Sequence, residues 1–123
     1  MVRAKLTAEQ LRRIEEIEEY RRATDHLKHL VVELEANRAG QTRIIQQLSE
    51  KIVNEASQMR QRALTANIGA IADIAGAMSV MAGRGGGIIM KIRVLGDAVN
   101  SLYMQLDAVL KHVMTPPEPK KPT

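Results

Sequence analysis

Apolar residues recur three and four positions apart along most of this chain, which is the spacing of one face of an α-helix. Thr7 and Gln10 stand three residues apart, as the two members of a capping box do. The apolar series that follows predicts an amphipathic, coiled-coil-like helix over residues 8–38. Its members are Leu11, Ile14, Ile17, Tyr20, Leu27, Leu30, Val31 and Leu34.

The pattern falters around Gly40, where Asn37, Arg38 and Gln41 occupy positions that should be apolar. A lone glycine costs a helix about 1 kcal/mol but does not force a break. We favour a tight turn at Gly40 over a kinked helix that runs straight through, and the second reading stays open. The apolar spacing then resumes and predicts a second helix over residues 42–83.

One face of the later part of this second helix contains only small residues. Such a face lets a neighbouring helix approach closely. We therefore predict that it is a helix-helix interface. Its members are Ala66, Gly69, Ala72, Gly76, Ser79 and Gly83.

The clearest heptad pattern lies in the last third of the chain and predicts a helix over residues 87–114. Pro116 and Pro117 cannot continue that helix, so residues 116–123 form a separate tail rich in Pro and Lys. We predict that the seam of this helix is a second helix interface. The seam begins with Ile88, Ile92, Leu95, Val99, Leu102 and Leu106.

Together these elements predict an all-α protein with one helical domain over residues 1–115. The expected architecture is an antiparallel bundle or coiled-coil hairpin of three long helices, with the first two continuous if Gly40 is only a kink. Three helices of unequal length leave apolar surface uncovered. We therefore expect the bundle to be completed by oligomerisation.

The glycine-rich stretch "GRGGG" between the last two helices raises the question of a phosphate site. Phosphate-binding glycine loops follow a β-strand, and the Walker type also needs a Lys-Ser/Thr pair. Here the stretch follows a helix and lacks that pair. We interpret it as the corner of a helical hairpin, with an anion held beside Arg84 and Lys91 as the alternative.

Composition limits the possible chemistry. The chain has no cysteine, which excludes disulfides, thiol nucleophiles and cysteine-bound zinc. Asp25, His26, His29 and Glu33 cluster in sequence, but three nearby cations would repel a metal ion, so we expect a solvated patch and no metal or cofactor. No Ser/His/Asp set is suggested, and Asp73 is the one carboxylate in an apolar context. We therefore expect that the protein is not an enzyme.

The formal net charge is +4, and the excess is local. Residues 56–96 carry five cations against Asp73 alone, and they are candidates for contact with an anion or with nucleic acid. Against that use, two tyrosines in 123 residues are too few for a base-stacking platform. The five cations are Arg60, Arg62, Arg84, Lys91 and Arg93.

The leading hypothesis is a non-enzymatic helical scaffold, adaptor or structural subunit whose partners are copies of itself or helices of other proteins. A nucleic-acid-associated protein is the alternative. A membrane-active or pore-forming hairpin is less favoured, because Asp73 interrupts the apolar residues 66–82 and no stable membrane span is expected. No stretch resembles a signal peptide, so we expect a cytoplasmic protein.

Overall fold

The computed structural model describes residues 6–84 and 87–115. The all-α prediction is confirmed: the described residues form helices joined by short connections, with no β-strand among them. These residues hold four helices rather than the three predicted. They are α1 (Ala8–Ala36), α2 (Thr42–Thr65), α3 (Gly69–Gly83) and α4 (Ile88–Met114).

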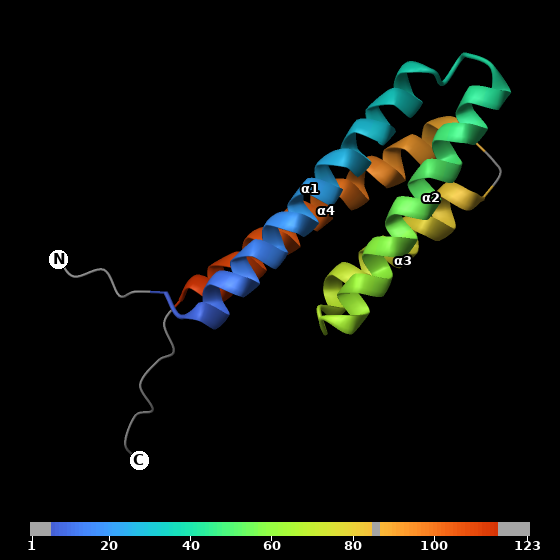
Figure 1. Cartoon of the computed structure of the whole chain (residues 1–123). Helices are drawn as coiled ribbons and strands as arrows, with labels where there is room; N and C mark the ends of the chain where they lie inside the picture. The colour runs from blue at the N-terminus through green and yellow to red at the C-terminus, as the bar shows by residue number, and fades with distance from the viewer. Residues whose placement is uncertain (1–5, 85–86, 116–123) are drawn as a thin grey trace.

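The four helices form a bundle in which each helix packs against two others. Contacts join α1 with α2, α2 with α3, α3 with α4, and α4 with α1. Figure 1 shows α1 and α4 side by side over their length, while the shorter pair of α2 and α3 stops before the terminal ends of α1 and α4. The bundle is therefore complete at the end where α1 turns into α2 and consists of two helices at the other.

The predicted helix over residues 42–83 is wrong as a single helix, because the chain breaks between α2 and α3. Asn67 has a φ of 59°, in the left-handed region. The amide of Ile68 donates to the carbonyl of Ala63 at 2.9 Å, and that of Asn67 to Leu64 at 3.2 Å. These two bonds are those of a Schellman motif, which satisfies the last carbonyls of α2 and ends it.

The turn at Gly40 is confirmed, and the kinked continuous helix is not observed. Helix α1 ends at Ala36, two residues earlier than predicted, and α2 begins at Thr42. The amide of Gly40 donates to the carbonyl of Asn37 at 2.8 Å, which closes the turn. Asn37 also donates from its side chain to the carbonyl of Glu33 at 2.8 Å.

The predicted capping box starts α1. The amide of Gln10 donates to the Thr7 hydroxyl at 3.1 Å, and the Thr7 amide donates to Gln10 Oε1 at 2.8 Å. Gln10 also donates from Nε2 to the carbonyl of Val113 at 3.0 Å. One side chain therefore caps α1 and binds a carbonyl in the last turn of α4.

The core runs through all four helices and contains aliphatic side chains, methionines and alanines, with Tyr20 as its one aromatic residue among the buried positions. The predicted hairpin corner before α4 includes residues 85 and 86, which lie outside the described residues, as does the predicted tail at 116–123. The packing of α3 against α4 accords with a helical hairpin there. The large side chains with the least exposure are Tyr20, Leu27, Leu34, Ile52, Ile71, Met78, Leu95, Leu102 and Leu106.

Candidate functional site

The break at Asn67 divides the small-residue face that the sequence predicts as an interface. Ala66 is the C-cap of α2, whereas the other five residues belong to α3. Ala72 is buried, Gly76 and Ser79 are half-buried, and Gly69 and Gly83 are exposed. Part of this face lies against α2 of the same chain.

Two glycines of α3 show how closely this helix approaches α2. A Cβ built on Gly76 would lie 3.1 Å from Cδ of Arg60, and one built on Gly83 would lie 3.7 Å from a methyl of Val53. Arg60 and Val53 are both on α2. Small side chains on α3 therefore let two helices of one chain come close together.

The predicted seam of the last helix also lies largely inside the chain. Leu95, Val99, Leu102 and Leu106 are buried in the core. Ile88 and Ile92, at the start of α4, are only partly buried. The seam therefore holds the bundle together over most of its length and becomes accessible near the N-terminal end of α4.

The structure separates the five candidate cations instead of gathering them on one face. Arg60 lies in the groove between α2 and α3, beside Gly76 and Ser79. Arg62 forms an ion pair with Glu19 of α1 at 2.6 Å. Arg93 lies in another groove, between α4 and α1.

The other two cations lie near the junction of α3 and α4. Lys91 donates from Nζ to the carbonyl of Ala82 at 3.3 Å, where it favours the C-terminal end of the α3 dipole. Arg84 is the exposed C-cap of α3.

Arg62, which pairs with Glu19, also lies over the ring of Tyr20, whose centroid is 5.5 Å from the guanidinium carbon. A cation bound in this way is less available to a phosphate.

The candidate site that the structure adds is a groove between α1 and α4, which we call the α1/α4 groove. It encloses about 520 Å³ and is lined by apolar residues flanked by charged ones. Val32 and Ile89, two of its lining residues, are 53% and 74% exposed. The lining residues are Lys28, Val31, Val32, Glu35, Arg38, Ile89, Ile92, Arg93, Gly96, Asp97, Val99 and Asn100.

Gly96 lines this groove without a side chain. A Cβ built on Gly96 would meet no atom of the described chain within 4 Å. Gly96 is half-buried, and the absence of a side chain there leaves room for another helix to approach the backbone. The groove therefore combines exposed apolar side chains with a point of close access.

The charged residues along the groove carry both signs. Lys28, Arg38 and Arg93 are cations, and Glu35 and Asp97 are carboxylates, all of them exposed. None of the five forms an ion pair within residues 6–84 and 87–115. Arg38 donates to the carbonyl of Glu35 at 3.1 Å, and Lys28 lies 5.9 Å from the centroid of the Tyr103 ring, so neither cation is neutralised by a carboxylate of the described chain.

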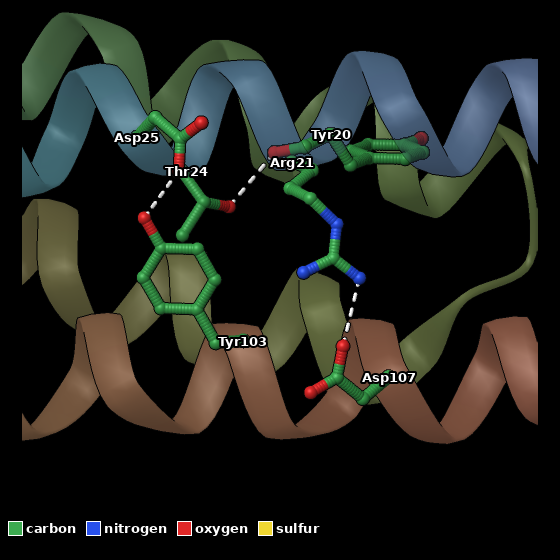
Figure 2. A network of polar contacts seen from close by, with 6 residues as sticks. All are labelled: Tyr20, Arg21, Thr24, Asp25, Tyr103 and Asp107. Atoms are coloured by element: carbon green, nitrogen blue, oxygen red, sulfur yellow. Dashed lines mark hydrogen bonds and ion pairs between the residues drawn. The ribbon is translucent and has the colours of Figure 1, made fainter.

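Polar contacts fix α1 against α4 beyond the groove. Tyr103 donates a hydrogen bond to Asp25, and Arg21 pairs with Asp107 at 2.7 Å (Figure 2). Desolvation and the bond to Asp25 raise the pKa of Tyr103 to about 12. Burial also raises the pKa of Tyr20, with the nearby Glu16 carboxylate adding to that rise. These contacts hold the two walls of the groove in a fixed register.

The cluster of acidic residues and histidines on α1 is divided among different neighbours. His29 pairs with Glu33 at 2.7 Å, and His26 lies 3.0 Å from Glu55 of α2. Asp25 accepts the bond from Tyr103. Within the described parts of the chain, no three acidic or histidine side chains gather where they would hold a metal ion.

Sequence reasoning missed the α1/α4 groove because it followed the buried stripe of each helix. The signal was present in a second, mixed stripe. Lys28, Val32 and Glu35 recur at helical spacing on α1, and Arg93, Gly96 and Asp97 do so on α4. An exposed valine and a mid-helix glycine among charges are the features that mark it.

Among the helices described here, none combines the length and the apolar character that crossing a membrane requires. The sequence matches no protein-family model, and neither a curated protein nor a solved structure shows significant similarity to the chain.

Proposed function

We propose that this protein is a non-enzymatic helical scaffold or structural subunit that acts in the cytoplasm through helix-helix protein contacts. The observation that carries the proposal is the α1/α4 groove, where Val32 and Ile89 are exposed around the open position of Gly96. Exposed apolar patches with polar borders are typical of protein interaction sites. The partner is a second copy or a helix of a larger assembly.

Light scattering across a range of protein concentrations tests this proposal. We expect a species heavier than one chain, and we expect Ile89→Gln to shift it toward the monomer. The matched control is Met104→Gln, because Met104 lies on the same helix, is 71% exposed and is outside the groove. A wild-type protein that stays monomeric at every concentration contradicts a homo-oligomeric scaffold.

A salt series separates this function from nucleic-acid binding. Contact with phosphates weakens steeply as salt rises, because bound counterions are released. Burial of apolar surface depends far less on salt of ordinary concentration. Arg60 and Arg93 lie in different grooves and Arg62 is paired with Glu19, and this separation favours the protein partner. Tight, salt-sensitive binding to duplex or single-stranded probes would favour the alternative.

A further inference from the structure

The two charged residues of the groove that lie within α1 are placed symmetrically about its apolar residues. Lys28 and Glu35 are exposed, stand seven residues apart and flank Val31 and Val32. Seven residues are about two turns, so both side chains lie on one face of α1. If two copies of α1 packed antiparallel about this midpoint, each Lys28 would oppose Glu35 of the second copy.

The α4 side of the groove repeats this arrangement. Arg93 and Asp97 are exposed and stand four residues apart, about one turn, with Gly96 between them. Antiparallel packing about their midpoint would place each Arg93 opposite Asp97 of the second copy. The glycine lies beside this midpoint, where two crossing helices come nearest.

The two midpoints lie at nearly the same height along the bundle. Asp25 is level with Tyr103, and Arg21 is level with Asp107, as their contacts show (Figure 2). When this antiparallel register is extended along both helices, the midpoint on α1 falls within about 2 Å of the midpoint on α4, at 1.5 Å per residue. A single two-fold axis therefore serves both sets of charges.

We propose that the α1/α4 groove binds the same groove of a second copy, about a two-fold axis perpendicular to the helices. In this dimer α1 packs on α1 and α4 on α4, with Lys28 opposite Glu35 and Arg93 opposite Asp97. Such an interface is self-complementary, as two-fold symmetry requires. This dimer rests on the proposed function and specifies its partner.

The mixed charge of the groove favours a second copy over a different helix. A uniformly acidic partner would meet Glu35 and Asp97, and a uniformly basic one would meet Lys28, Arg38 and Arg93. A second copy presents the opposite sign at each of four positions. Val32 and the space above Gly96 then supply the apolar contact between the paired charges.

Charge reversal with rescue tests the dimer. Lys28→Glu brings two carboxylates together at both ends of the interface, and we expect it to raise the dimer dissociation constant roughly tenfold or more. Glu35→Lys should have a similar effect. The double variant Lys28→Glu/Glu35→Lys restores opposite charges and should return the constant to near the wild-type value. Arg43→Glu is the matched control, because Arg43 is exposed on α2 and outside the groove.

Gly96→Gln supplies a second measurement that does not depend on charge. A Cβ at Gly96 would meet no atom of the described chain within 4 Å, so we expect the monomer to stay folded while the dimer loses its closest contact. If neither Gly96→Gln nor any of the charge reversals changes the dimer dissociation constant, this interface is wrong and the scaffold function still stands. A wild-type protein that stays monomeric at every concentration overturns this interface and the homo-oligomeric form of the scaffold, and leaves a helix of a larger assembly as the partner. Weakening by each single reversal, with recovery in the double variant, supports the interface.

Discussion

The phenol of Tyr103 on α4 donates a hydrogen bond to the carboxylate of Asp25 on α1 (Figure 2). Nζ of Lys28, on α1, lies 5.9 Å from the centroid of the same ring. The chain has only two tyrosines, and the other, Tyr20, lies beneath Arg62. Each aromatic ring therefore joins two helices through both a packed face and a nearby cation.

This contact makes the stability of the fold depend on pH in alkaline solution. The pKa of the Tyr103 phenol is raised from 10.0 to about 12 in the folded chain. Above pH 10 the unfolded chain therefore binds fewer protons than the folded one, and the free energy of unfolding falls as pH rises. The contribution of Tyr103 is fully present below pH 10 and is lost as pH approaches 12. Urea unfolding of the wild type over this range measures the fall.

Tyr103→Phe isolates the part of that fall due to Tyr103. We expect the free energy of unfolding of this variant to be about 1 kcal/mol lower than that of the wild type at neutral pH, because a hydrogen bond between α1 and α4 is removed. Its unfolding free energy should fall less steeply between pH 10 and 12 than that of the wild type. The remaining slope includes Tyr20, whose pKa is also raised. Equal slopes in the two proteins would show that the Tyr103 phenol does not titrate as described.

The break between α2 and α3 depends on a residue in the left-handed region. Asn67 adopts a φ of 59°, which costs most residues about 1–2 kcal/mol and glycine little. We expect Asn67→Ala to lower the free energy of unfolding by about 1 kcal/mol, and Asn67→Gly to leave it unchanged or raise it. Chemical denaturation of both variants measures the difference. If alanine were tolerated as well as glycine, α2 and α3 would be continuous in solution.

The two breaks show which parts of this fold can be predicted from sequence. The turn at Gly40 was predictable because Asn37, Arg38 and Gln41 interrupt the apolar spacing. The break at Asn67 was not, because the apolar spacing runs on through it to Ile68 and beyond. A single residue in the left-handed conformation ends α2 there. Whether Asn67 adopts that conformation depends on how α3 packs against the other helices, which the apolar spacing does not give. The heptad pattern likewise identified the α4 seam but not which chain covers it.

The α1/α4 groove was harder to predict than the fold for a related reason. Val32 lies off the buried stripe of α1, and on sequence alone it resembles any scattered surface valine. Val32 belongs to a groove only because Gly96 and Ile89 lie near it. Those two residues are more than fifty positions away in sequence, and the pairing of α1 with α4 brings them together with Val32. The contact between Tyr103 and Asp25 shows the register of that pairing, which the periodicity of each helix alone does not give.

Ser49 presents a buried hydroxyl on α2. Its side-chain oxygen has no hydrogen-bond partner in the described part of the chain. A buried polar group without a partner costs roughly 1–3 kcal/mol, so we expect Ser49→Ala to stabilise the fold by about 1 kcal/mol. Ser57→Ala is the control, because Ser57 lies on the same helix at a half-buried position and shares the gain in helix propensity. Thermal melts measure the difference. If the melting temperatures of the two variants rose equally, the Ser49 hydroxyl would have a hydrogen-bond partner.

The close packing of α3 on α2 gives opposite predictions for two neighbouring small residues. A Cβ at Gly76 would lie 3.1 Å from Cδ of Arg60, but Arg60 is exposed and flexible. Its side chain can move aside at little cost. Gly76→Ala should therefore raise the free energy of unfolding by up to about 1 kcal/mol, because alanine has a higher helix propensity than glycine.

Ala72, in contrast, is only 2% exposed and belongs to the core cluster. Ala72→Leu inserts three carbon atoms where the surrounding side chains cannot yield, and overpacking of this kind typically costs about 1–3 kcal/mol. Denaturant unfolding of the two variants beside the wild type decides the case. A destabilised Gly76→Ala protein would mean that Arg60 is held firmly over the glycine. A stable Ala72→Leu protein would mean that α3 does not pack on its neighbours as closely as its small side chains allow.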